Sequence, residues 1–165
     1  MDLKDKIRSI EDYPQKGVIF RDITTLLKGA VDAITASLAD VSFDLVLSPE
    51  SRGFIFGMPV AYNMGKGFVP VRKAGKLPAE TISKEYELEY GKATIEIHKD
   101  AIKPGQKVVI VDDLMATGGT AKAIMEMVEE MGAEVVASAF LIELDFLNGR
   151  KVLPDCRVEA VIHYE

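Results

Sequence analysis

Short runs of apolar residues alternate along the chain with longer segments in which apolar residues are spaced more widely. Continuous aliphatic runs are typical of strands buried on both faces, as in a parallel sheet. We predict such strands over residues 43–49, 67–73, 108–111, 134–144 and 157–164. Helices are predicted over residues 30–40, 52–64 and 120–131. This order of elements predicts an α/β domain with a mainly parallel central sheet flanked by helices.

Two segments, within the first ten residues and over residues 52–64, predict helices with pronounced apolar surfaces. Leu3, Ile7 and Ile10 fall on one helical face, which predicts a short amphipathic helix within the first ten residues. The helix over residues 52–64 is apolar on nearly all sides, so we expect it to be buried in the core or at a subunit interface. Pro59 lies inside this segment, where a proline removes a backbone hydrogen bond and tends to interrupt a helix.

Residues 74–90 differ in composition from the predicted strands and helices. They contain glycine, proline and many charged residues, and they show no apolar face. We predict a long mobile loop here. It is followed by a strand over residues 94–98, in which apolar and polar residues alternate.

The composition is that of one globular domain. The chain has 165 residues, of which 48% are hydrophobic and 28% are charged; this fits a single domain with a sizeable core. The net charge of −6 argues against nucleic acid as the main partner, because proteins that bind nucleic acid present a basic face. No apolar run approaches the roughly 18 residues of a membrane span, and the first residues lack the apolar core of a signal peptide. We therefore expect a cytoplasmic protein.

Cysteine and histidine are scarce in this sequence. Cys156 is the one cysteine, so the chain can form neither an internal disulfide nor a metal site built from cysteines. His98 and His163 lie far apart and match no zinc-binding pattern, and we expect both to be ordinary strand residues. A zinc site is therefore not predicted.

The sequence VVIVDDLMATGGT, residues 108–120, joins a predicted buried strand to a predicted helix. The first turn of a helix has free backbone N–H groups and a partial positive charge, which attract phosphate. Gly118 and Gly119 let the backbone approach an anion closely, and the hydroxyls of Thr117 and Thr120 add donors. The loop is a candidate phosphate site at the carboxyl end of a strand, where α/β proteins bind ligands.

Asp112 and Asp113 end the same strand and need a different explanation. Adjacent carboxylates do not bind phosphate directly, but they accept hydrogen bonds from neighbouring hydroxyls, such as O2 and O3 of a ribose. They also suit a position near a magnesium ion. A ribose 5-phosphate would then span the aspartates and the glycines.

Other phosphate-binding motifs are absent from the sequence. The Walker A spacing G-x-x-x-x-G-K-[ST] does not occur, and no G-x-G-x-x-G follows a strand. A purely structural alternative stays open at this point. In that alternative the two aspartates form a turn before the helix, and the two glycines form a simple loop.

The same stretch resembles the 5-phosphoribosyl pyrophosphate (PRPP) signature of the type I phosphoribosyltransferases, which combines a hydrophobic strand, two acidic residues and a T-G-G-T loop. Four further segments resemble the members of this family that use adenine. They are YPQKGVIFRDITTLL, SPESRGFIFG, VPVRKAGKLP and YELEYGKATIEIHKDAIKPG, at residues 13–27, 48–57, 69–78 and 86–105. The resemblance runs from about Ile10 to Tyr164, and Met115 stands where the family often has leucine.

The resemblance implies the type I phosphoribosyltransferase fold and the transfer of a 5-phosphoribosyl group from PRPP to N9 of adenine. The products would be AMP and pyrophosphate, as in purine salvage. It also implies Mg²⁺ as a cofactor, held mainly by PRPP near Asp112 and Asp113, and a homodimer. We expect the dimer surfaces at the amino-terminal helix and the helix over residues 52–64.

The resemblance also assigns roles along the PRPP molecule. Asp112 and Asp113 would bind the ribose hydroxyls. The 5-phosphate would be bound by Ala116, Thr117, Gly118, Gly119 and Thr120. The pyrophosphate would be bound by Ser51, Arg52, Arg72, Lys73 and Lys76, with a cis peptide bond expected at Glu50–Ser51. Arg72 counts as catalytic here, because positive charge stabilises the leaving pyrophosphate.

Adenine would be bound by the amino-terminal segment, residues 1–28. The backbone C=O and N–H of Ile19 would match the amino group at N6 and the acceptor N1 of the base. Phe20 would stack on the ring, and Arg21 would contact the base or its surroundings. Without the resemblance, plain core packing would explain this apolar segment equally well.

Residues 74–90 would form a lid that keeps water from the reacting carbon. Glu89 would act as general acid or base at N7 or N9 of the purine, and Tyr90 would contact PRPP. Three alternatives stay open: an enzyme of the same fold that uses another base, a PRPP sensor without catalysis, and a general nucleotide-binding module.

Overall fold

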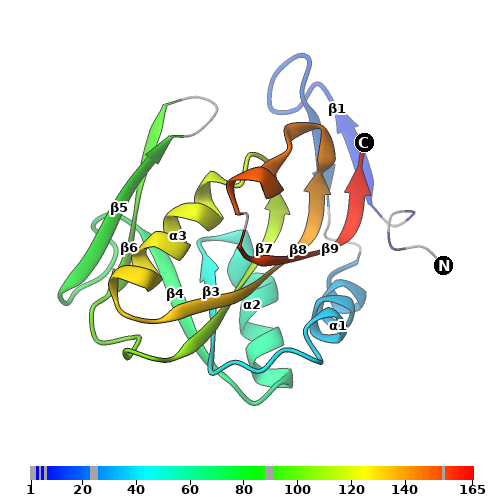
Figure 1. The fold of residues 1–165 in the computed structure, drawn as a ribbon. Helices are drawn as coiled ribbons and strands as arrows, with labels where there is room; N and C mark the ends of the chain where they lie inside the picture. The colour runs from blue at the N-terminus through cyan, green and yellow to red at the C-terminus, as the bar shows by residue number, and fades with distance from the viewer. Residues whose placement is uncertain (1–2, 4, 6, 23–25, 88–90, 154) are drawn as a thin grey trace.

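The strands predicted from the sequence assemble into one central sheet, shown in Figure 1. The computed structural model describes residues 3, 5, 7–22, 26–87, 91–153 and 155–165. The strands of the central sheet are β3 (Leu45–Pro49), β4 (Gly67–Lys73), β5 (Thr81–Glu87), β6 (Lys92–His98), β7 (Lys107–Met115), β8 (Glu134–Leu144) and β9 (Arg157–Tyr164). The helices are α1 (Leu27–Ser37), α2 (Arg52–Asn63) and α3 (Gly119–Glu130).

The strand order of the sheet is β5-β6-β4-β3-β7-β8-β9. β4, β3, β7, β8 and β9 run parallel to their neighbours in this series. β5 and β6 form an antiparallel hairpin that continues the sheet beside β4. The mainly parallel α/β fold predicted from the sequence is confirmed.

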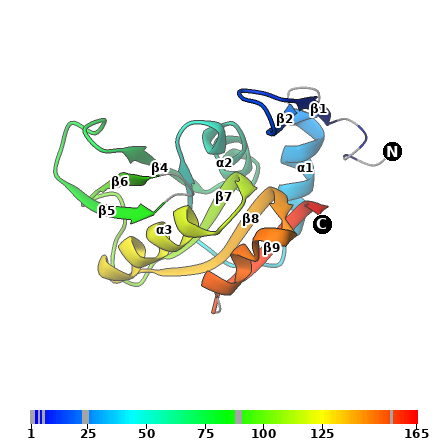
Figure 2. The same ribbon diagram turned by 90° about the horizontal axis from the view of Figure 1, so that it is seen from above.

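Helices cover both faces of the sheet, with α1 and α2 on one side and α3 on the other (Figure 2). β7 explains why both faces are covered. Val108 and Ile110 pack beneath α3, whereas Val109 and Val111 pack beneath α1 and α2, and each of the four is at most 1% exposed. A strand buried on both faces needs a continuous apolar run, which is the pattern found in the sequence.

The amino-terminal segment forms a strand pair instead of the predicted amphipathic helix. β1 (Arg8–Glu11) and β2 (Ile19–Asp22) make a separate two-stranded antiparallel sheet. The helix prediction is wrong for residues 8–10, because Ile10 pairs with Phe20 across this small sheet. Pairing with a distant segment outweighs a local helical spacing that rests on three residues.

The segment 74–90 also differs from the prediction, because residues 81–87 form the regular strand β5. Ile82 and Tyr86 of β5 pack against the core cluster beneath α3. Lys84 contacts the same side, since its Nζ lies 2.8 Å from Oε2 of Glu126 on α3. A charged residue on the inward face hides the apolar alternation that would have predicted a strand.

The helix over residues 52–64 is confirmed as α2, which continues through Pro59. Its inner face is buried, as expected, and Phe56 and Val60 are fully inaccessible to solvent. The outer face is apolar and exposed, with exposed fractions of 46%, 52% and 82% for Ile55, Met58 and Tyr62. The prediction of burial in the core therefore holds for one face only. Among the described residues, no helix is long and apolar enough to cross a membrane.

Parallel pairing brings the carboxyl ends of β3, β7, β8 and β9 to one edge of the sheet. The β1-β2 pair lies beside this edge, next to β8 and β9, in Figure 1. Ligands of open α/β sheets bind at such an edge. The fold therefore places the candidate residues of β2, β3 and β7 near one another.

Gly57 allows α2 to approach β3 closely. A Cβ atom at this position would lie 1.8 Å from Oγ and 2.9 Å from Cβ of Ser48. We predict that Gly57→Ala lowers the free energy of unfolding by about 1–3 kcal/mol, as overpacking of a tight core does. Asn63→Ala, at an exposed position of the same helix, is the control. Equal chemical denaturation midpoints for the two variants would contradict the prediction.

Candidate active site

Three adjoining cavities open at the carboxyl ends of the parallel strands. The first, of about 410 Å³, lies beside the loop from β7 to α3. The second, of about 400 Å³, lies between the ends of β3 and β7, and the third, of about 470 Å³, lies between β2 and the ends of β8 and β9. Leu114 lines all three, Asp112 lines the first and second, and Asp113 lines the second and third. The two aspartates therefore lie where the cavities meet.

The first cavity is lined by the phosphate loop, the name used here for residues 116–120. All five residues predicted to bind the 5-phosphate line it. Gly118 is left-handed, with a φ of 80°, and α3 begins at the next residue. Glycine adopts this conformation without steric cost, and the amides of the first helical turn have no acceptor within the helix. The loop can therefore offer several N–H donors to an anion.

The end of β5 contacts the phosphate loop at the second cavity, which Tyr86 lines. Thr120 Oγ1 donates a hydrogen bond to the Tyr86 hydroxyl at 3.1 Å. A Cβ atom at Gly119 would lie 3.3 Å from the carbonyl oxygen of Glu87. The β5-β6 hairpin thus lies against the phosphate loop at Gly119 and Thr120.

The two aspartates have different electrostatic surroundings. Oδ2 of Asp113 lies 2.8 Å from Nε of Arg52, so its charge is matched. Asp112 accepts a hydrogen bond from the amide of Asp113 at 2.8 Å. Burial and then the charge of Asp113 raise the pKa of the Asp112 carboxyl well above its usual range, against the opposing effects of that amide and of Arg52. Two carboxyl groups therefore face one cationic side chain here, and their oxygens suit hydroxyl donors or a bound cation.

The second cavity contains part of the predicted pyrophosphate site. Ser51, Arg52 and Lys73 line it, and the Glu50–Ser51 peptide bond is cis, as the resemblance implied. Arg72 reaches the cavity wall through a hydrogen bond from its Nε to Glu50. Burial alone would raise the pKa of Glu50, but the hydrogen bonds from Arg72 and the backbone of Lys73 outweigh it and hold that pKa below its usual value.

Three predicted site residues fall outside this grouping. Lys76 is exposed and does not line any of the three cavities. Glu89 and Tyr90, the two residues assigned to the lid, lie outside the described residues. Their roles stay predictions.

The third cavity is lined on one side by Ile19, Phe20 and Arg21 of β2, the three predicted base-binding residues. Ile19 is 52% exposed and begins β2. The guanidinium of Arg21 lies 4.2 Å from the centre of the Tyr164 ring and donates a hydrogen bond to Ser9 Oγ. This side is therefore held in place by contacts with β1 and β9.

The other side of the third cavity was missed by the sequence analysis. It is formed by Ile142, Leu144, Phe146 and Tyr164. Leu144 and Tyr164 are paired neighbours at the ends of β8 and β9. Apolar residues that end two adjacent parallel strands could have indicated a flat ligand, because the carboxyl ends of such strands share one edge.

Each of the three adjoining cavities is lined by a different kind of chemical group. Backbone donors come first, then a carboxylate pair with nearby cations, and then a slot with apolar walls. This order fits a phosphorylated sugar on which a flat base replaces an anionic group at one carbon.

Comparison with known proteins agrees with this geometry. A model of the phosphoribosyl transferase domain matches residues 9–157. The adenine phosphoribosyltransferase of Agathobacter rectalis is 58% identical over 169 residues, which cover 99% of this chain and 97% of that protein.

Solved structures give the same result. The crystal structure of adenine phosphoribosyltransferase from Thermoanaerobacter pseudethanolicus matches with a TM-score of 0.94 and 50% identity, over 98% of each chain. That from Saccharomyces cerevisiae, complexed with an imino-altritol bisphosphate and adenine, matches with a TM-score of 0.85 and 42% identity, over 94% of each chain. With a matching family model and relatives of such identity over nearly its whole length, this chain belongs to the phosphoribosyltransferase family.

Proposed function

We propose that this chain transfers the 5-phosphoribosyl group of PRPP to N9 of adenine, releasing AMP and pyrophosphate. The observation that carries the proposal is the position of the Asp112–Asp113 pair at the junction of the three cavities. A ribose on this pair has its 5-phosphate beside the phosphate loop, its pyrophosphate beside Arg52 and Lys73, and its C1 facing the third cavity. The relatives that match over the whole chain are named for the same reaction.

The reaction needs charge stabilisation more than it needs a nucleophilic side chain. The bond from C1 to the pyrophosphate oxygen breaks, C1 gains cation-like character, and N9 of adenine attacks it. Negative charge develops on the leaving pyrophosphate, beside Arg52 and Lys73, and fixed cations stabilise it there. Removing one such group typically costs about 10²–10³ in rate. Arg72 acts on the same group through the wall that it forms with Glu50.

Mg²⁺ is the cofactor that fits this donor set. Asp112 and Asp113 supply carboxylate oxygens, and the pKa of Asp112 is raised first by burial and then by the charge of Asp113, which a nearby cation would offset. The ion, held mainly by PRPP, would neutralise charge on the pyrophosphate when bound. The aspartates themselves orient the ribose by accepting hydrogen bonds from its hydroxyls.

Adenine occupies the third cavity in this proposal. The backbone of Ile19 reads N6 and N1 of the base, Phe20 stacks on the ring, and Arg21 fixes the edge of the slot. Leu144 and Phe146 supply apolar contacts on the opposite side. The position of β2 on one side of the cavity and of the apolar residues on the other supports this assignment.

Further parts of the proposal rest on the sequence. Residues 74–90 act as a lid, within which β5 contacts the phosphate loop. Glu89 serves as general acid or base, and Tyr90 contacts PRPP. Lys76 adds positive charge near the pyrophosphate. The chain forms a homodimer, for which the exposed apolar face of α2 is a suitable surface. Its free Cys156 agrees with a cytoplasmic location.

A panel of bases tests the proposed function. We predict that PRPP and Mg²⁺ give product with adenine, and none with hypoxanthine, xanthine, guanine or uracil. Turnover with an oxopurine instead of adenine would be consistent with the fold but would overturn adenine as the substrate. Tight PRPP binding without product from any base would indicate a sensor.

The ribose-binding role of Asp113 gives a second prediction. Asp113→Ala removes a charged hydrogen-bond acceptor, so the KM for PRPP should rise about tenfold to a hundredfold. Asp100→Ala, at an exposed aspartate away from the cavities, is the matched control and should leave KM unchanged. Steady-state kinetics with varied PRPP measure both variants, and an unchanged KM in Asp113→Ala would remove this residue from ribose binding.

A further inference from the structure

The short 3-10 helix η3 (Gly149–Val152) lies directly against the phosphate loop. A Cβ atom at Gly118 would lie 2.5 Å from the carbonyl oxygen of Gly149. Conversely, a Cβ atom at Gly149 would lie 2.5 Å from the carbonyl oxygen of Ala116 and 3.1 Å from the amide nitrogen of Gly118. The two backbones touch without side chains between them, so the position of η3 limits where the phosphate loop can lie.

One ion pair attaches η3 to the sheet. Nε of Arg150 donates to both carboxylate oxygens of Glu143, at 2.8 and 3.0 Å, and its Nη2 donates to Oε2 at 2.7 Å. Its Nη1 donates to the carbonyl oxygen of Val158 on β9 at 2.8 Å. The side chain of Glu143 is only 4% exposed and lies near the end of β8, in register with Met115 of β7. Arg150 thus ties η3 to the two strands beside the phosphate loop.

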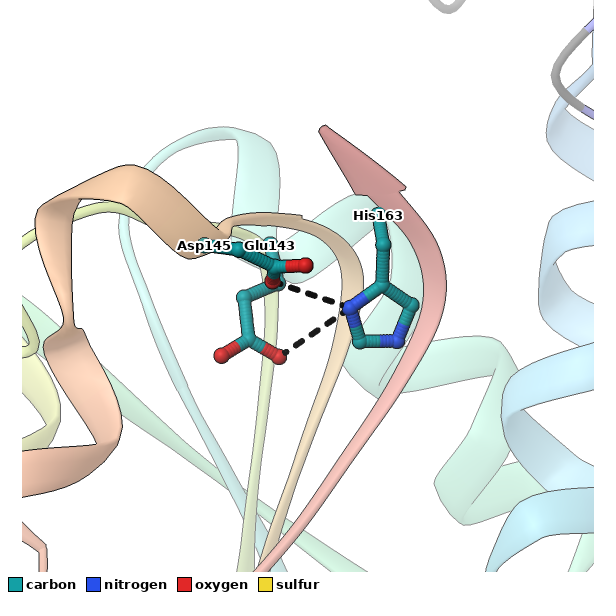
Figure 3. A group of neighbouring side chains, drawn as sticks. All are labelled: Glu143, Asp145 and His163. Atoms are coloured by element: carbon teal, nitrogen blue, oxygen red, sulfur yellow. Dashed lines mark hydrogen bonds and ion pairs between the residues drawn. The ribbon is translucent and has the colours of Figure 1, made fainter. Parts of the chain in front are cut away.

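Two further side chains surround Glu143, as Figure 3 shows. Nδ1 of His163 lies 3.0 Å from Oδ1 of Asp145 and 3.7 Å from Oε2 of Glu143. The three groups are close enough to share a metal ion. However, Arg150 already occupies both oxygens of Glu143, and its charge opposes a second cation there. Within this cluster, the contact with η3 comes from Glu143 through Arg150. His163 lies in β9, as expected of a strand residue, and also pairs with Asp145.

We propose that Arg150 and Glu143 are positioning residues for the 5-phosphate: their ion pair holds Gly149 against the phosphate loop and thereby fixes the backbone donors of residues 116–120. The proposal rests on the proposed function of that loop. Neither residue lines the first cavity, so both act through Gly149. A planar guanidinium bound by two parallel hydrogen bonds restricts orientation as well as distance, which a lysine does not.

We test this inference with the ratio of the protein's affinity for AMP to its affinity for adenosine. The two ligands differ only in the 5-phosphate, so the ratio isolates its contribution. Loss of folded protein lowers both affinities together and leaves the ratio unchanged. Displacement of the loop lowers the affinity for AMP alone. We expect Gly149→Ala to lower the ratio about tenfold to a hundredfold, as misplacement by a fraction of an ångström to one ångström does.

Arg150→Lys provides a second variant that keeps the charge and should also lower the ratio, even if Gly149→Ala fails to fold. Arg157→Lys is the matched control. Arg157 precedes Val158 in β9, but its side chain pairs with Asp40 and Glu159 at 2.8 and 2.7 Å and not with Glu143, so its replacement should leave the ratio at the wild-type value.

The outcomes separate this inference from the proposed function. Suppose that the wild type prefers AMP and that Arg150→Lys and Gly149→Ala both fold and keep the wild-type ratio of AMP to adenosine affinity. That result would overturn the positioning role and leave the 5-phosphate site unaffected. A wild-type protein that binds AMP no better than adenosine would overturn the 5-phosphate site itself. A ratio lowered in both variants and unchanged in Arg157→Lys would support the role of Arg150.

Discussion

The burial of the Asp112 carboxyl directly beside that of Asp113 is the constraint on which the rest of the site depends. Arg52 matches the charge of Asp113, and α2 approaches Asp112 so closely that a Cβ atom at Gly53 would lie 2.8 Å from its Oδ1. The carboxyl of Asp112 is left with a raised pKa, which means that its ionised form destabilises the folded chain. Proteins retain such a loss of folding stability where the charged group binds a ligand.

The parallel sheet surrounds this pair with elements of different rigidity. β7 and β8 are buried on both faces and fix the aspartates and Glu143. The phosphate loop has glycines on the sides facing η3 and the hairpin, so its position depends on both neighbours. The base cavity, in contrast, has one wall from the sheet and one from the separate β1-β2 pair. In the proposed function, phosphate and ribose would lie at the most deeply buried strands of the sheet, and the base would lie between two units.

Much of this could be predicted from the sequence, because buried parallel strands have continuous apolar runs and the segment from Val108 to Thr120 joins such a strand to a helix. The strand β5 was not predictable by periodicity, since Lys84 faces inward to Glu126. The amino-terminal strand pair depends on a partner ten residues away. The anchor of Arg150 on Glu143 was also hidden, because it is a contact between side chains whose approach is set by the path of η3.

Thermal unfolding of Asp112→Asn as a function of pH tests the central claim most directly. Because the folded-state pKa of Asp112 lies above that of an unfolded carboxyl, the wild type should lose stability as the pH rises through that raised pKa, and the variant should not. At neutral pH the free variant should therefore melt higher, by about 2–4 °C for each kcal/mol gained by removing the buried charge beside Asp113. With PRPP and Mg²⁺ the wild type should gain more and reverse the order. A free variant that melts lower than the wild type at neutral pH would contradict the claim that the carboxylate pair is kept at a cost in stability.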